Sequence, residues 1–318
     1  MALSLKQKIQ DPRQGVYLIG TTPPKMGTDK AQLETIAKKL LNRLHEIEYD
    51  GVVIYDIQDE SSRISAPRPF PFKKTVDPRE YSQLISQLSH LDVITYKSVA
   101  QRDESEFNTW LDETANKFKL KNLVLVGSPS STGNIKLSLP NAYKALSEDK
   151  NSVFLGGVTI AERHASKRNE HDRLLEKIDQ GCDFFISQAV YNAQETIDLI
   201  TSYSRSCRHK GISPKRIILT FTPCGGEKTL DFMKWLGISV PEATKWRILD
   251  SNDSLNESIR ICRDNLNQVL QSCAHLDVPL GLNIESLTNR KEEIDASINL
   301  YRLLKATMEL NLAEKQIA

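Results

Sequence analysis

The chain has 318 residues, of which 39% are hydrophobic, so it can bury a sizeable core. Its formal net charge of +1 gives no reason to expect a nucleic acid or an anionic membrane as a partner. No run of about 18 apolar residues is present, and the N-terminal segment MALSLKQKIQDPRQG has no apolar stretch of the signal-peptide type. We therefore expect a cytoplasmic protein.

Short apolar segments alternate with longer amphipathic segments along the whole chain, which predicts strands followed by helices. The segments predicted as strands are 15–22, 51–57, 91–97, 122–128, 152–160, 182–188, 216–222 and 278–286. The segments predicted as helices are 29–47, 78–90, 104–118, 141–148, 168–181, 192–206, 227–237, 252–274 and 291–310.

Eight strands that read as continuous apolar runs indicate parallel strands buried on both faces. This number suits an α/β fold in which one domain, residues 1–318, forms a single (β/α)8 TIM-type barrel. A doubly wound open sheet is the alternative. It would usually carry a GxGxxG turn after its first strand, where this chain has GTTPPKMG.

Polar groups follow the apolar core of each predicted strand, and in a barrel these carboxyl ends line the mouth where ligands bind. Two neighbouring strands show the pattern best, since one ends in Glu162, Arg163 and His164 and the next in Ser187 and Gln188. The other endings supply Thr21, Thr22, Tyr55, Asp56, Gln58, Glu60, Tyr96, Lys97, Ser128, Thr220, Thr222, Asn283 and Glu285.

A long connection, residues 58–77, follows the second strand and contains the segment RISAPRPFPFKK. Long loops on the active face of a barrel often serve as lids. Phe70 and Phe72 can stack on a heterocycle, and Arg68 or Lys73 can meet an anionic tail. Polyproline-type packing of this segment onto the barrel rim is the equal alternative.

The five cysteines form no CxxC pair, which predicts free thiols and neither a disulfide framework nor a zinc site. Cys224, in TPCGGEK, is a nucleophile candidate to which no partner base can be assigned. His164 and His171 lie seven residues apart without a third ligand at suitable spacing, so we expect no bound metal.

The order of these motifs resembles the methylenetetrahydrofolate reductase family over nearly the whole chain. The resemblance is clearest in TPPK, LVLVGSPSSTG, GGVTIAERH through LLEKIDQGCDFFISQAVYN, and VPEATKW followed by NIESLTNR. That family is a (β/α)8 barrel that carries a flavin at its mouth and passes a hydride from a reduced nicotinamide to methylenetetrahydrofolate. The resemblance implies an NAD(P)H oxidoreductase of one-carbon metabolism that uses FAD, NADH or NADPH and a tetrahydrofolate-type substrate.

The resemblance also implies roles for individual residues. Gln188 falls on the glutamine that lies beside the flavin and contacts the folate. His164 falls on a flavin-contacting histidine, Lys177 on a lysine near the flavin pyrophosphate, and Gly127 on the glycine of an R-G-D flavin motif whose aspartate is here Ser128.

Other positions depart from the family pattern. The family's general acid, a glutamate at the end of the first strand, corresponds to Gly20, and the arginine of R-G-D corresponds to Val126. Tyr96 stands in place of a histidine, and Glu227 in place of an aromatic residue. Loss of the acid removes the group that protonates N10 as the five-membered ring opens, a contribution of about 10²- to 10⁴-fold.

Glu60 and Glu162 are our candidates for a replacement acid, because a carboxyl group in a partly enclosed mouth has a raised pKa. A salt bridge that shapes the rim is the alternative for each. Tyr55, Phe72 and Glu285 are further candidates for contacts with the folate, beside Gln188.

Basic residues gather at the start of the helix predicted at 168–181, namely Lys167, Arg168, Arg173 and Lys177. They predict either a site for a phosphate-bearing cofactor or a solvated helix face. Two functions besides reduction remain open: a folate- or flavin-binding barrel without reductase activity, and a folate-dependent one-carbon transferase. The sequence also leaves a homo-oligomer open.

Overall fold

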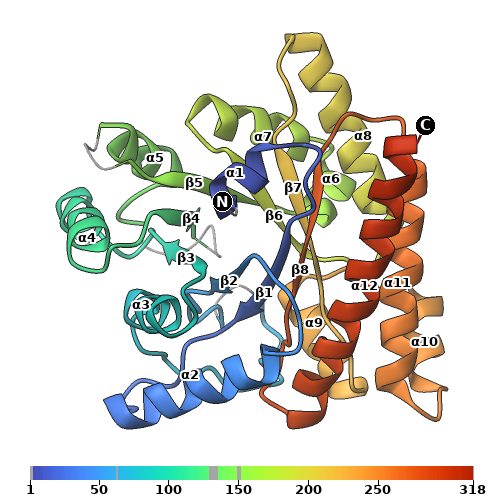
Figure 1. Cartoon of the computed structure of the whole chain (residues 1–318), viewed down its shortest axis with the longest axis horizontal. Coiled ribbons are helices and arrows are strands. Elements are labelled where there is room, and N and C mark those ends of the chain that lie inside the picture. The colour runs from blue at the N-terminus through green and yellow to red at the C-terminus, as the bar shows by residue number, and fades with distance from the viewer. Residues whose placement is uncertain (1–2, 62–63, 129–134, 149–151, 318) are drawn as a thin grey trace. The chain divides into compact units, whose positions relative to one another are not determined.

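The computed structural model describes residues 3–61, 64–128, 135–148 and 152–317 (Figure 1). Eight strands form a closed barrel in chain order, and the neighbours whose register is defined are parallel. The predicted (β/α)8 fold is therefore confirmed. The strands are β1 (Tyr17–Thr21), β2 (Gly51–Ile54), β3 (Asp92–Ser98), β4 (Asn122–Val126), β5 (Phe154–Thr159), β6 (Phe184–Ala189), β7 (Arg216–Phe221) and β8 (Leu280–Ile284).

Each predicted helix is present among the described residues. The helices are α1 (Leu5–Gln10), α2 (Lys30–Leu44), α3 (Pro78–Ser89), α4 (Glu104–Asn116), α5 (Leu139–Glu148), α6 (Ala161–Lys167), α7 (Glu170–Asp179), α8 (Ala193–Lys210), α9 (Glu227–Leu236), α10 (Glu242–Leu249), α11 (Ser254–Ser272) and α12 (Lys291–Ile317). We did not predict α1, α6 and α10, which have six to eight residues and are too short for a clear 3.6-residue period. The prediction that Glu162, Arg163 and His164 directly end a strand was wrong, since they belong to α6.

The described residues divide into two compact units. One, called here the 18–158 unit, comprises residues 18–158 and 177–183; the other, called the 184–318 unit, comprises residues 1–17, 159–176 and 184–318. The single domain expected over the whole chain stays a prediction.

In the 18–158 unit, helix α3 packs on β2 and β3, and Tyr81 and Ile85 on its inner face are buried. Its start is specified locally, because the Asp77 side chain accepts from the Arg79 amide and Pro78 occupies the first turn. The loop predicted at 58–77 has no helix or strand among its described residues, and residues 62–63 lie outside them. Its end is tied to the TPPK segment, since the amide of Met26 donates to Lys74 and that of Val76 to Pro24.

In the 184–318 unit, α11 and α12 lie side by side and α12 packs on β8 (Figure 1). Arg216 begins β7 and is only 2% exposed. Its guanidinium donates to the carbonyl oxygens of Ile9 (3.0 Å), Asp11 (2.6 Å) and Leu280. The end of α1 is thereby joined to the amino ends of β7 and β8, the barrel end that usually serves stability.

None of the helices in the described ranges is both long and apolar enough to cross a membrane.

Candidate functional site

A β-bulge in β6 sets the position of Gln188. Ile186 pairs with Ile218 and Ala189 with Thr220, so Ser187 and Gln188 together face only Leu219 of β7. The Ser187 hydroxyl accepts from the Thr220 amide (2.9 Å) and donates to the Gln188 carbonyl oxygen (2.8 Å), which replaces part of the strand ladder. Bulges of this kind re-aim side chains near functional sites.

The amide group of Gln188 is oriented by the protein itself. Its Nε2 donates to the Leu236 carbonyl oxygen at 2.8 Å, and the side chain is half-buried. This contact settles which side of the amide is the donor, and it leaves the side-chain carbonyl as a hydrogen-bond acceptor. Gln188 can therefore receive a hydrogen bond from an N–H or NH₂ group of a ligand.

Glu162 lies in the first turn of α6, beyond the carboxyl end of β5. Its Oε1 accepts from the Ser239 amide at 3.0 Å. Burial raises the pKa of the Glu162 carboxyl, and the nearby charge of Glu195 raises it further, while the Ser239 amide opposes the shift. Glu162 thus holds its proton to higher pH than an ordinary glutamate, as a general acid must.

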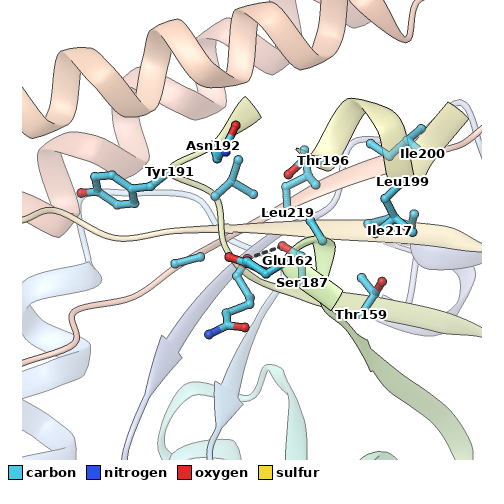
Figure 2. Close-up of a pocket in the computed structure, with 14 residues that line it drawn as sticks. Thr159, Glu162, Ser187, Tyr191, Asn192, Thr196, Leu199, Ile200, Ile217 and Leu219 are labelled. Atoms are coloured by element: carbon cyan, nitrogen blue, oxygen red, sulfur yellow. Dashed lines mark hydrogen bonds between the residues drawn. The ribbon is translucent and has the colours of Figure 1, made fainter. Parts of the chain in front are cut away.

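Glu162 and Gln188 line one cavity, together with Ser187 (Figure 2). Leu199, Ile200 and Ile217 supply apolar walls, and Figure 2 shows them to one side of Glu162 and Ser187. The cavity has room for roughly one water molecule, so a pterin does not fit inside it.

His164 and Lys177, both predicted to contact a flavin, are turned toward the protein. His164 is 2% exposed, and its ring makes an edge contact with that of His171 at a centroid distance of 5.2 Å. Burial and the neighbouring His171 lower the pKa of His164, so the ring is neutral at pH 7. In the 18–158 unit, Lys177 is 7% exposed and its ammonium donates to the Val158 carbonyl oxygen.

Gly127 and Ser128 follow β4 in the 18–158 unit and are half-buried. A Cβ atom added at Gly127 would meet Leu139 at 3.5 Å, an ordinary contact, so the glycine is not required by space. Residues 129–134, the rest of the SPSSTG motif, lie outside the described residues. Of the residues predicted for a flavin, His164 belongs to the 184–318 unit, whereas Gly127, Ser128 and Lys177 belong to the 18–158 unit.

Two of the four basic residues predicted to meet a phosphate, Arg168 and Arg173, lie near carboxylates. Arg173 lies 3.6 Å from Glu170, which is fully buried and also binds Arg163 at 2.9 Å. Arg168 lies 3.7 Å from Asp198. These pairs favour the solvated-face interpretation for this helix start. In the described part of the chain, no three His, Cys, Asp or Glu side chains come together as a metal site would need.

In the 18–158 unit, Tyr55 and Tyr96 form an aromatic pair at the carboxyl ends of β2 and β3. Their ring centroids are 4.8 Å apart at an interplanar angle of 67°. In the loop that follows β2, Arg68 lies over the Phe72 ring at 5.7 Å. Glu60 is half-buried in the same loop. Tyr55, Glu60 and Phe72 thus belong to one unit, while Glu162 and Gln188 belong to the other.

Glu285 immediately follows β8 in the 184–318 unit and is half-buried. Its amide continues the strand ladder by donating to the Phe221 carbonyl oxygen at 3.1 Å. The structure therefore puts this residue at the carboxyl end of a strand, as predicted.

The glycine-rich turn TPCGGEK serves packing. Glu293 is 1% exposed and accepts from the Gly225 amide (3.1 Å), the Thr229 hydroxyl (2.7 Å) and the Thr288 hydroxyl (2.5 Å). A Cβ atom at Gly225 would lie 2.5 Å from the Glu293 carboxylate, so the turn needs a glycine there. Cys224, next to it, is fully buried.

We expect the cysteines to be inert toward a thiol reagent such as DTNB in the native protein at pH 8. All five are buried. Burial raises the pKa of Cys182 and Cys273 to about 11 and that of Cys224 and Cys262 to about 12, and it also raises the pKa of Cys207. Rapid release of one equivalent of thionitrobenzoate before unfolding would reopen the nucleophile hypothesis; five equivalents should appear in denaturant.

The sequence did not point to three residues that join this site: Asn192, Glu195 and Ser239. The Ser239 hydroxyl donates to Glu195 Oε1 at 3.0 Å, and Asn192 Nδ2 donates to that hydroxyl at 3.2 Å. Asn192 and Glu195 lie at the start of α8, and Ser239 lies between α9 and α10. Polar residues in those positions are common, so no sequence signal distinguished them.

The family model for methylenetetrahydrofolate reductase matches residues 157–290. An uncharacterized protein from Clostridium thermocellum, described as binding two copies of 5-methyl-5,6,7,8-tetrahydrofolic acid, is 34% identical. The match covers 95% of this chain and 99% of that one, with a TM-score of 0.81. No curated protein matches this chain in sequence.

A GH113 β-1,4-mannanase is also similar in structure, with a TM-score of 0.52 over 92% of this chain and 98% of that one. Its identity is 11%, so the likeness concerns the fold and carries no information about substrate.

Proposed function

The chain belongs to the methylenetetrahydrofolate reductase family, and from that premise we propose that it binds a tetrahydrofolate carrying a one-carbon unit. The observation that carries the proposal is the 34% identity, over nearly the full length of both chains, to a protein described as binding 5-methyltetrahydrofolate. The geometry of Gln188 supports it. The amide nitrogen is held by Leu236, and the free carbonyl can accept from the amino and ring N–H groups that a pterin presents.

The reaction we propose is reduction of the methylene form. A hydride from NADH or NADPH adds to the methylene carbon, the bond from that carbon to N10 breaks, and N10 takes one proton. The products are 5-methyltetrahydrofolate and the oxidised nicotinamide. Glu162 is our candidate for the proton donor, because its pKa is raised and it lines the same cavity as Gln188.

FAD does not enter this proposal as a carrier of the hydride. Of the residues predicted for a flavin, His164 is packed on His171 and Lys177 donates to Val158. The proposed hydride transfer is therefore direct, and added FAD becomes a variable of the test.

A second candidate function is binding of the folate without reduction, or transfer of its one-carbon unit to another acceptor. The position of the family's general acid supports it, since the chain has the buried Gly20 there. The inward-turned His164 and Lys177 support it as well.

Two measurements test these proposals. Calorimetric titration of 5-methyltetrahydrofolate into the protein should show saturable binding, and no binding would contradict the folate proposal. Anaerobic oxidation of NADH and NADPH with methylenetetrahydrofolate, with and without FAD, then separates the functions. Turnover without flavin supports direct reduction, turnover only with flavin overturns the direct route, and binding without turnover favours the second candidate.

Replacing Gln188 with leucine should weaken binding of 5-methyltetrahydrofolate by about 10- to 100-fold, because the change removes the acceptor for the pterin and leaves the Leu236 carbonyl unpaired. Calorimetric titration measures the affinity. The matched control is Gln194→Leu on the exposed face of α8, which should bind as the wild type does. Unchanged affinity in Gln188→Leu would remove Gln188 from the site.

A further inference from the structure

The last residue of α9 and the segment that follows it, residues 236–239, are held by four polar side chains of the candidate site. Gln188 donates to Leu236, Glu162 accepts from the Ser239 amide, Ser239 donates to Glu195, and Asn192 donates to Ser239. These side chains come from β6, α6, the start of α8 and the connection into it. Ser239 is therefore hydrogen-bonded to the carboxyl groups of both Glu162 and Glu195.

The two carboxyl groups are close because both contact Ser239, one through its amide and one through its hydroxyl, each at 3.0 Å. Within the described residues, the second oxygen of Glu195 is buried and has no hydrogen-bond partner. Two neighbouring carboxylates that are both ionised repel each other, so the charge of one raises the pKa of the other. The size of this effect depends on the other charges nearby.

The charges around Glu162 come from several elements. On its own helix, Arg163 binds the buried Glu170 of α7, which also lies within 3.6 Å of Arg173. His164 on the same helix contacts His171 of α7. Arg168 lies near Asp198 of α8. The charge of Arg163, adjacent to Glu162 in sequence, lowers the pKa of Glu162, but Arg163 itself binds Glu170. Glu195, which contacts Ser239 beside Glu162, acts in the opposite direction.

We propose that Glu195 and Ser239 are positioning residues that hold the Glu162 carboxyl group in place and in its protonated form. Ser239 fixes the orientation of Glu162 through its amide, and the Glu195 carboxylate disfavours a second negative charge beside it. This inference rests on the proposed function, since a protonated Glu162 is what the proposed reduction requires. The effect of Glu195 on the Glu162 pKa agrees in direction.

The test is a pH titration of the protein without ligand. NMR monitors the carboxyl resonances of ¹³C-labelled glutamate at each pH. Glu162→Gln removes one resonance and thereby assigns it. Glu195→Gln keeps an oxygen that can accept from Ser239 but removes the charge, so the midpoint of the Glu162 titration should move to lower pH. Glu242→Gln, an exposed glutamate close to Ser239 in sequence, is the matched control and should leave the midpoint unchanged.

A second variant, Ser239→Ala, tests the proposal independently if Glu195→Gln does not fold. It keeps the amide contact with Glu162 and removes a donor from Glu195, which makes an ionised Glu195 less stable, so the midpoint of the Glu162 titration should stay or fall. An unchanged midpoint in a folded Glu195→Gln, or a higher one in Ser239→Ala, would overturn the proposal. If reduction is observed, Glu195→Gln should also lower its rate at pH 7 by about tenfold.

The titration uses no ligand, so its outcome is independent of the folate proposal. Failure of 5-methyltetrahydrofolate to bind would contradict the proposed function while leaving the Glu195 result standing. A failed titration shift with intact folate binding would contradict only the role of Glu195 and Ser239.

Discussion

Glu162→Gln is expected to lower the rate of methylenetetrahydrofolate reduction by about 10²- to 10⁴-fold while folate affinity stays close to that of the wild type. Glutamine keeps an oxygen that can accept from the Ser239 amide, so the local hydrogen bond survives. It cannot release a proton to N10 as the ring opens. Single-turnover oxidation of NADH or NADPH in the presence of saturating methylenetetrahydrofolate measures the effect.

The same role for Glu162 predicts how the rate of reduction changes with pH. Reduction needs the protonated carboxyl group, so the wild-type rate should fall as pH rises through the Glu162 pKa. That pKa is raised by burial and by Glu195, so the fall should come at higher pH than for an ordinary glutamate. The rate of the Glu162→Gln variant should not show this fall.

Glu60→Gln is the matched comparison, because Glu60 is the other acid that the sequence suggested. If Glu162 is the donor, Glu60→Gln should reduce methylenetetrahydrofolate at nearly the wild-type rate. A large loss in Glu60→Gln with little change in Glu162→Gln would transfer the proton-donor role to the loop after β2.

Arg216→Met should lower the free energy of unfolding by about 3 kcal/mol or more. The side chain is 2% exposed and donates to carbonyl oxygens of Ile9, Asp11 and Leu280. Methionine fills much of the same space but donates nothing, so buried carbonyl groups lose their partner. Urea unfolding followed by circular dichroism measures the change.

Arg205→Met, on the exposed face of α8, is the control for the loss of one positive charge and should unfold nearly as the wild type does. If Arg216→Met is as stable as this control, α1 does not stabilise the amino ends of β7 and β8 through the arginine. Because Arg216 lies at the opposite end of β7 from Thr220 and the bulge, folate affinity should change little in the folded fraction.

The barrel could be predicted from the sequence because each buried strand is a short, nearly continuous apolar run and each long helix repeats its apolar residues at a period near 3.6. The segment CDFFISQ shows this, since its apolar part became β6 and Gln188 lies near its carboxyl end. The short helix α6 was not predicted, because its seven residues form barely two turns and show no clear apolar period. Glu162, which we predicted to end a strand, lies in this helix, beyond the end of β5.

The sequence by itself determined the family, the strand order and the two polar residues, Glu162 and Gln188, that line one cavity. Only the tertiary structure decided what surrounds them. Ser239 is separated from Glu162 by 77 positions and from Glu195 by 44, and only folding brings the three together. Likewise His164 and Lys177 look available in the sequence but are buried. Whether a side chain faces a ligand or the protein depends on packing between distant segments, which no local pattern encodes.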